Sequence, residues 1–177
     1  MTGGDFDLGT LSGNNLSFSN SNSLPEIKGK TLDITCSGAT LVAFSVTDNR
    51  SSSVIRPGEN PRNYYGLGVD SQGNKIGSYR PAHDGAIPAA ADGSTAVFKH
   101  STDDGVSWST QSGIAISPSA FANNIYAISP PPDNTHSPIT TASLPLSLAA
   151  KIQPLGTLDT SADITIDGYA TFELVYL

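Results

Sequence analysis

The stretch that decides the fold is the C-terminal one, Ile164-Thr-Ile-Asp-Gly-Tyr-Ala-Thr-Phe-Glu-Leu-Val-Tyr-Leu177. It contains two short alternating segments joined at Asp167-Gly168, and the second segment runs to the last residue. In an extended chain alternate side chains point to opposite faces, so one face of the second segment carries Ala170, Phe172, Leu174 and Tyr176. A final strand this apolar needs partners on both edges and a cover for its apolar face.

Two arrangements satisfy this requirement. In the first, the final strand pairs between two earlier strands of the same chain. In the second, one edge is left open for a strand from another molecule. The residues of the stretch alone favour the first arrangement, because single-domain β proteins often end in this way.

The composition predicts one all-β domain that spans residues 1–177. The length suits one domain with a sizeable core. Only 14% of the residues are charged, 17 glycines and 12 prolines are spread along the chain, and no segment has a sustained helical period. This pattern is typical of a β protein with many turns. We therefore predict a two-sheet antiparallel β-sandwich with almost no helix.

Charge and hydropathy limit the possible partners. The net charge of −7 argues against nucleic acid, and the sequence has no apolar run long enough to span a membrane. The chain starts Met1-Thr2-Gly3-Gly4-Asp5, which is not a signal peptide. One cysteine, one methionine and few lysines favour an exported protein whose leader has been removed. A cytoplasmic protein is the alternative.

The alternation of apolar residues predicts several strands, and prolines limit others. A polar Ser37-Gly38 should end one strand, and residues 80–93 should form a loop. Pro145 and Pro154 exclude a continuous helix or a central strand over residues 140–158, so we predict a strand there with one proline at a sheet edge. The predicted strands are Asp5–Gly9, Lys30–Cys36, Leu41–Thr47, Tyr64–Val69, Lys75–Tyr79 and Thr95–His100.

Ser101-Thr-Asp-Asp-Gly-Val-Ser-Trp108 fits the S-x-D-x-G-x-x-W pattern of an Asp-box, a hairpin turn that occurs in sialidases. Ser101 and Asp103 should accept hydrogen bonds from turn amides, Gly105 permits a positive φ, and Trp108 should pack over the hairpin. We interpret the motif as structural. A sialidase propeller repeats the box several times and needs about twice this length, so a glycosidase is not expected.

The sequence predicts no catalytic, cofactor-binding or metal-binding residue, and the chain is not expected to be an enzyme. His83, His100 and His136 share no ligand spacing. Asp70, Gln72 and Asn74 resemble the start of a calcium loop, but the later glutamate is missing. Cys36 lies in phase with Leu32 and Ile34, which predicts a buried thiol unless a partner cysteine once preceded Met1.

Six segments carry a resemblance to a known family: Gly3–Gly9, Leu32–Cys36, Val46–Arg50, Tyr65–Gly68, Lys75–Tyr79 and Asp167–Leu177. Together they resemble the DUF1120 family, whose bacterial proteins are associated with fimbrial operons, and more broadly the subunits of chaperone–usher pili. The family implies an incomplete immunoglobulin-like sandwich that lacks its final strand. A periplasmic chaperone first lends that strand, and the N-terminal extension of a neighbouring subunit then replaces it.

The resemblance implies an open groove, and so it reverses the preference between the two arrangements. Ala170, Phe172, Leu174 and Tyr176 would flank the groove that accepts the donor strand. Cys36 would match the second cysteine of a disulfide whose first cysteine, like the donor extension, would precede Gly3. The expected function is a structural or adhesive fimbrial subunit of a Gram-negative bacterium, exported through the periplasm to the cell surface. Its partners would be neighbouring subunits, a periplasmic chaperone and an usher.

An exported carbohydrate-binding β-sandwich adhesin is the alternative. Four aromatic residues could line a glycan site by stacking, although core packing is the favoured role for two of them, Tyr79 and Trp108. The four are Tyr64, Tyr65, Tyr79 and Trp108.

Overall fold

The computed structural model describes residues 1–2, 5–8, 15–55, 61–110, 115–121, 123–131 and 135–177. Every strand pair in these ranges is antiparallel, and their helical elements are short 3₁₀ turns, which confirms the all-β prediction. The turns are η2 (Ser51–Ser53), η3 (Pro61–Asn63), η4 (Ser119–Phe121) and η5 (Leu155–Thr157). The strands are β1 (Asn22–Ser23), β2 (Ile27–Thr40), β3 (Val42–Asp48), β4 (Tyr65–Gly66), β5 (Gly77–His83), β6 (Ala89–Ala91), β7 (Ser94–Ser101), β8 (Ser109–Thr110), β9 (Ile125–Ser129), β10 (Ile139–Ile152) and β11 (Ala170–Tyr176).

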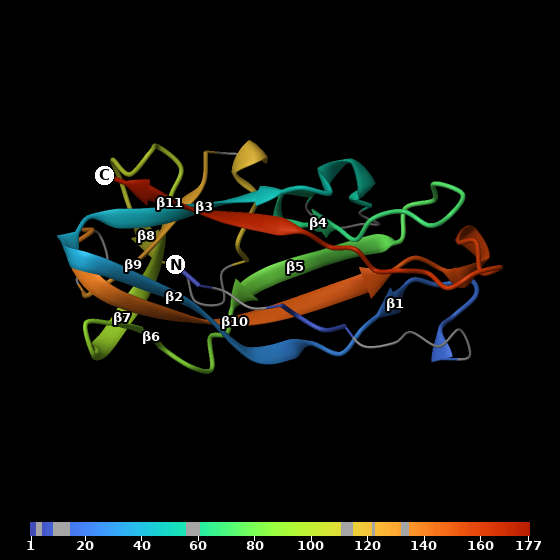
Figure 1. Cartoon of the computed structure of the whole chain (residues 1–177), viewed down its shortest axis with the longest axis horizontal. Helices are drawn as coiled ribbons and strands as arrows, with labels where there is room; N and C mark the ends of the chain where they lie inside the picture. Colours follow the sequence, from blue (N-terminus) through green and yellow to red (C-terminus); the bar gives the residue numbers. More distant parts are fainter. Residues whose placement is uncertain (3–4, 9–14, 56–60, 111–114, 122, 132–134) are drawn as a thin grey trace.

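The eleven described strands form one hydrogen-bonded network (Figure 1). Its main path runs β11-β3-β9-β7-β6-β10-β5-β4, and β1, β2 and β8 branch from it. The long strand β10 pairs with β1, β2, β5 and β6. We divide this path into two arms. The first arm contains β3 and β9 and ends at β11, and the second contains β10 and β5 and ends at β4.

The two arms share one hydrophobic core. Phe44 of β3 and Ile128 of β9 belong to the same buried cluster as Leu32 of β2 and Leu144 of β10. The Phe44 ring stacks on that of Tyr126 with centroids 5.6 Å apart. Buried apolar residues of both arms thus pack together in one core. The burial of these side chains is the main favourable contribution to folding.

The position of β10 corrects the prediction made from its prolines. Pro145 lies inside the most heavily paired strand, opposite Thr31 of β2. The Pro145 carbonyl accepts the Asp84 N–H at 2.9 Å. Because the nitrogen and the carbonyl of one strand residue point to the same edge, the Pro145 nitrogen also faces the edge of β10 next to Asp84. On that edge β5 begins to pair at Leu146 and β6 ends at Ser143. The missing N–H of Pro145 therefore falls at the junction of two shorter strands, where it costs no ladder bond.

Two predicted interruptions are also wrong. Strand β2 continues through Ser37-Gly38 to Thr40, because a register shift between the Thr35 and Thr40 pairs with β10 absorbs the extra residues. Within residues 80–93, β5 extends to His83 and β6 forms, because β10 offers both of them an edge. Propensity predicted a loop here, and tertiary pairing overrides it.

Two predicted strands have no ladder. Residues 5–8 are irregular, and Gly9 lies outside the described residues. Residues 162–169, which include the first of the two C-terminal alternating segments, are irregular as well. Ile164 and Ile166 nevertheless pack against the core, together with Phe6 and Leu8. Their alternation thus reflects packing against a surface and not membership of a sheet.

The burial of a lysine ammonium was not predicted. Lys99 of β7 is fully buried, and its ammonium donates to Ser129 Oγ at 2.9 Å and to the carbonyls of Pro130 and Thr135. A buried ammonium is costly unless oxygen acceptors surround it. These bonds hold the start and the end of the β9–β10 connection against β7.

Candidate functional site

The last strand pairs with β3 along one edge. The register runs without a shift from Ala170 opposite Asp48 to Tyr176 opposite Val42. Just outside this ladder, Tyr169 O accepts the Asn49 N–H and the Leu177 N–H donates to Leu41 O. Successive residues of a strand point their N–H and C=O groups to alternate edges. The odd-numbered residues from 169 to 177 therefore face β3.

The even-numbered residues face the other edge. Strand β11 ends the path of strands, and no described strand pairs with it there. Ala170, Phe172, Leu174 and Tyr176 thus direct their backbone N–H and C=O groups away from β3. An unpaired row of this kind is the template that another strand needs in order to extend a sheet.

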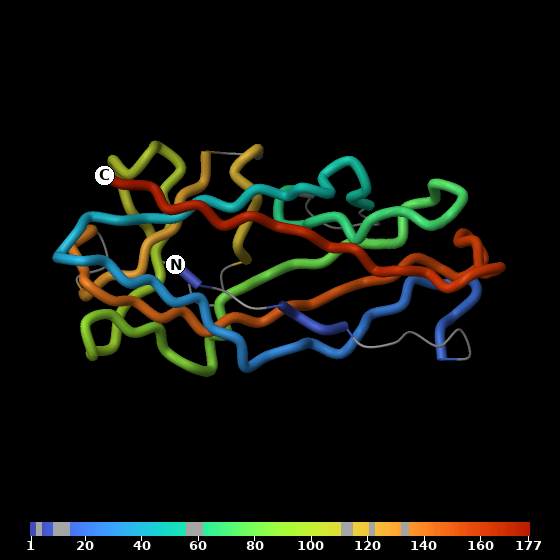
Figure 2. Tube along the Cα trace, in the orientation of Figure 1, coloured from blue at the N-terminus to red at the C-terminus, as the bar shows by residue number. Residues whose placement is uncertain are grey.

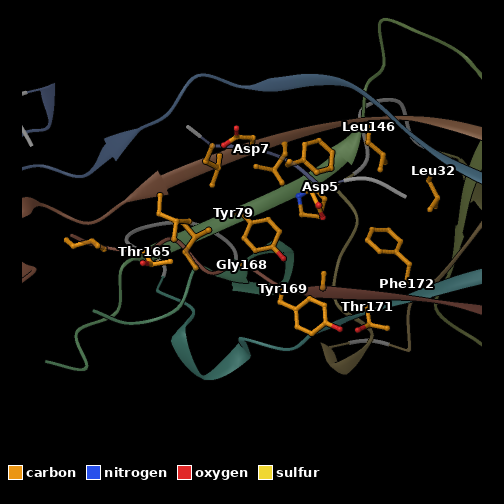
Figure 3. A pocket seen from close by; sticks show the side chains of 18 of the residues that line it. Asp5, Asp7, Leu32, Tyr79, Leu146, Thr165, Gly168, Tyr169, Thr171 and Phe172 are labelled. Carbon is orange, nitrogen blue, oxygen red and sulfur yellow. The ribbon is translucent and has the colours of Figure 1, made fainter. Parts of the chain in front are cut away.

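A groove of about 860 Å³ lies beside this edge. One side is the segment Asp163–Ile166 and the first part of β11, and the floor comes from β2, β5 and β10. Figure 3 shows Phe172 pointing from β11 towards Leu32 and Leu146. The apolar lining residues are Met1, Phe6, Leu8, Leu32, Leu67, Tyr79, Pro81, Leu146, Leu148, Ile164, Ile166, Gly168, Tyr169, Ala170 and Phe172.

One end of the groove is fixed where the chain enters β11. The Asp167 N–H donates to Leu67 O at 3.0 Å, and Arg50 forms an ion pair with the Asp167 carboxylate. A Cβ on Gly168 would lie 2.8 Å from the ring of Tyr79, so glycine allows the chain to cross over this ring. The Asp167–Leu67 bond thus joins the segment before β11 to the segment after β4, and these two strands are the two ends of the path.

The residues predicted to flank the groove do not all lie in the same environment. Ala170, Phe172 and Leu174 are half-buried and pack against the main core, and Phe172 lies 5.9 Å from Phe44 between ring centroids. Ala170 and Phe172 also line the groove. The ring of Tyr176 is 71% exposed. Tyr176 is therefore exposed in this structure, and its place beside a donor strand stays a prediction.

Sequence reasoning missed the floor of the groove. Leu146 and Leu148 lie on β10, and Tyr79 and Pro81 lie on the neighbouring strand β5, where Pro81 is opposite Leu148. Their alternation was visible in the sequence, but nothing local shows that two strands far apart in the chain share a face with β11. Burial raises the pKa of the Tyr79 hydroxyl, so this group stays neutral under ordinary conditions.

The Asp-box residues form the connection between β7 and β8. The Ser101 hydroxyl donates to Asp103 Oδ1 at 2.6 Å and accepts the Gly105 N–H at 2.9 Å. The N–H of Ser107 donates to Asp103 Oδ1 at 2.9 Å, and Gly105 has a φ of 89°. Trp108 is buried against Ala43, Ile125 and Ala127. These contacts give the motif a structural role.

Replacing Asp103 by asparagine should lower the melting temperature at pH 7. Hydrogen bonds from the hydroxyls of Ser101 and Ser107 lower the pKa of Asp103 to about 2. Because this folded-state pKa lies below the ordinary value of 3.8, the stabilisation is complete above about pH 4 and is lost as the pH falls towards 2. The difference in melting temperature between wild type and Asp103→Asn, followed by circular dichroism, should shrink over that range.

Asp104→Asn is the matched control. It removes the same charge one residue away and keeps a side chain that tolerates the φ of 56° at this position. A melting temperature that falls equally in both variants, or a difference that does not depend on pH, would contradict the proposed role of Asp103.

The remaining candidate residues form no reactive group. Cys36 is a free thiol that packs against the core. In the described ranges, no three His, Cys, Asp or Glu side chains come together in a way that could hold a metal ion. The same ranges contain no helix that is long and apolar enough to cross a membrane.

The aromatic residues of the alternative glycan site are mostly buried. Tyr65, Tyr79 and Trp108 are at most 9% exposed. The half-exposed Tyr64 lies under the guanidinium of Arg80 at 6.0 Å. A sugar cannot stack on rings that the core covers, so Tyr65, Tyr79 and Trp108 offer no stacking surface in this structure.

Comparison with known proteins supports part of the resemblance. Residues 1–60 match the family described as "Protein of unknown function (DUF1120)", which confirms this resemblance over that third of the chain. The chain is also similar to Protein GltF of Escherichia coli (strain K12). The two are 29% identical over an alignment of 179 positions, which covers 85% of this chain and 69% of GltF. No solved structure matches the chain. The Gly3-Gly4 part of the motif lies outside the described residues.

Proposed function

We propose that this chain is a structural or adhesive subunit of a bacterial surface fimbria, completed by a strand from a neighbouring subunit. The fold would then be an incomplete immunoglobulin-like sandwich of the pilin type, with the donated strand next to β11. The subunit would be exported through the periplasm of a Gram-negative bacterium, bound there by a chaperone, and delivered by an usher to the cell surface.

The observation that carries the proposal is the outward edge of β11 beside an apolar groove. The backbone groups of Phe172 and Leu174 face this edge, while their side chains pack into the core. An incoming strand could therefore bond to β11 and place alternate side chains over Leu146 and Tyr79 in the groove. Strand addition uses both kinds of contact, since main-chain bonds provide affinity and side-chain pockets provide specificity.

The groove is suited to a strand more than to a small polar ligand. It extends from Leu67 and Ile166 near the entry to β11 as far as Phe172 and Leu32. Most of its lining residues are apolar, and their chemistry matches that of an alternating strand with one apolar face. The resemblance to DUF1120, and through it to pilus subunits, points to a neighbouring subunit as the source of this strand.

The isolated chain should bind a model strand. As a strand probe we suggest a fluorescein-labelled twelve-residue peptide in which five valines alternate with five threonines, with a lysine at each end. Fluorescence anisotropy should show saturable binding, and hydrogen exchange should show new protection of the Phe172 and Leu174 amides. Pairing would protect these two amides because they face the outward edge.

A control peptide with aspartate in place of valine should not bind, because charge is costly in an apolar groove. Binding of both peptides would indicate non-specific association with the lysines. Absence of binding by the valine peptide, with no change in the exchange of β11 amides, would contradict the proposed function. As a second measurement, a pilus-type periplasmic chaperone co-expressed with the chain should co-purify with it.

A further inference from the structure

The N-terminal segment, which the structure describes at residues 1–2 and 5–8, contributes Met1 and residues 5–8 to the lining of the groove. Thr2 forms a bridge with Asp33 of β2, in which each N–H donates to the carbonyl of the other residue at 2.9 Å. Further along, Phe6 and Leu8 are half-buried and pack against the main core, and residues 5–8 line the groove next to β11. Figure 2 shows the N-terminus (blue) below the C-terminal strand (red), where both lie in the same region of the molecule.

The bridge at Thr2 uses the outer edge of β2. Asp33 also pairs with Ser143 of β10, which occupies the inner edge of β2 at this point. The outer edge faces the groove, where a strand inserted between β2 and β11 would find its second partner. Thr2 therefore occupies a position on β2 that an incoming strand requires, and residues 5–8 border the same groove.

This occupation is incomplete. The segment pairs with β2 at Thr2, and residues 5–8 add no strand ladder to it. A volume of about 860 Å³ is left beside the segment, and no described strand pairs with the outward edge of β11. The segment covers apolar surface with the side chains of Phe6 and Leu8, and a full strand would add ladder bonds to the outward edge of β11.

We propose that Phe6 and Leu8 act as a placeholder that must leave the groove when a strand from another molecule binds. The inference rests on the proposed function and adds a regulatory step to it. In the free subunit the segment shields the groove from solvent and from weak partners. Binding then requires the open form, so the apparent affinity is the intrinsic affinity multiplied by the fraction of molecules in which the segment has left.

A reversible lock tests this step. Thr2 and Asp33 form a hydrogen-bonded antiparallel pair, for which the Cα atoms lie about 5.5 Å apart, within the range that a disulfide spans. In a Cys36→Ser background, the double variant Thr2→Cys/Asp33→Cys should bind the strand probe at least about tenfold more weakly when oxidised than when reduced. The reduced protein is its own control, and mass spectrometry verifies the disulfide.

A second variant works in the opposite direction and needs no disulfide. Phe6→Ser/Leu8→Ser removes the apolar contacts of the segment without a change of charge, and both residues are only half-buried, so the fold should persist. It should bind the strand probe about tenfold more tightly than wild type. Val106→Ser is the control, since Val106 is 86% exposed in the β7–β8 turn, and it should bind like wild type.

The outcomes separate the two proposals. If the locked, unlocked and serine variants bind the strand probe equally well, the placeholder does not exist while the strand-binding groove does. If no variant binds, the proposed function is wrong and the placeholder fails with it. Weaker binding by the serine variant would show that Phe6 and Leu8 assist the incoming strand, which also overturns the inference.

Discussion

Alanine in place of Gly77 should remove much of the stability of the fold. Gly77 begins β5 opposite Ile152 of β10. A Cβ at this position would lie 2.1 Å from Lys151 O and 3.0 Å from Ile152 Cα, which are backbone atoms of the central strand. No side-chain rotation can relieve such a contact, so the two strands must separate locally. We expect the free energy of unfolding to fall by about 3 kcal/mol or more.

Urea unfolding followed by circular dichroism measures this change. The control is Gly38→Ala in β2, where an added Cβ would meet no atom within 4 Å and the substitution is chemically identical. Its effect should stay within about 0.5 kcal/mol. Equal midpoints for the two variants would contradict the close β5–β10 pairing.

Because β5 carries Tyr79 and Pro81, Gly77→Ala should also weaken binding of the strand probe by displacing the groove floor.

The sequence allowed the last strand to be predicted well because its alternation is local. Ala170, Phe172 and Leu174 pack on the core as their spacing indicated, whereas Tyr176, which was expected on the same face, is exposed. The same holds for the Asp-box, whose hydrogen bonds join residues within a few positions of each other, such as Ser101 and Gly105. Features of this kind depend on local geometry, so they can be predicted without knowledge of the tertiary structure.

The centre of the sheet could not be predicted in the same way. Pro145 is tolerated in β10 only because β5 and β6 meet opposite its nitrogen, and this depends on where two other strands end. Similarly, the groove needs Tyr79 and Leu148 to share a face with residues near the C-terminus. Such contacts join residues far apart in the chain, and periodicity within one segment contains no information about them.

In the sequence, only the resemblance favoured an open final strand over a paired one. Alternation at residues 170–176 fits both arrangements, because a strand buries its apolar face in either case. The structure adds which edge is occupied. Bonds at Tyr169 and Leu177 identify the β3 side, and so they fix the orientation of every backbone group between them.

Proline substitutions at adjacent positions of β11 should have opposite consequences. Proline removes one backbone N–H and is tolerated in a strand only where that N–H faces away from its partner. The Leu174 N–H faces the outward edge, while the Glu173 N–H faces Ser45 of β3. Leu174→Pro should therefore leave the β3 ladder intact, and Glu173→Pro should break it.

Burial of the side chains alone would predict the reverse order. Leu174 packs against the core, whereas Glu173 is exposed, so loss of the Leu174 side chain should cost more if only packing mattered. If the orientation of the backbone N–H decides, Glu173→Pro should lower the free energy of unfolding by about 1–3 kcal/mol, because it loses a ladder bond and leaves an acceptor unsatisfied. Leu174→Pro should then lower the free energy of unfolding by less. Urea unfolding of the two variants distinguishes these possibilities.

Leu174→Pro should weaken binding of the strand probe, although it is the variant with the smaller effect on stability. Leu174→Pro should stay folded and bind the probe at least about tenfold more weakly, because proline removes a donor that the added strand needs. Phe172→Asp should also lose binding, since it places a charge in the apolar groove, but its contact with Phe44 means that it should lose stability too. Only Leu174→Pro separates the two properties. A folded Leu174→Pro variant that still binds the strand probe with wild-type affinity would show that the outward edge of β11 does not accept a strand.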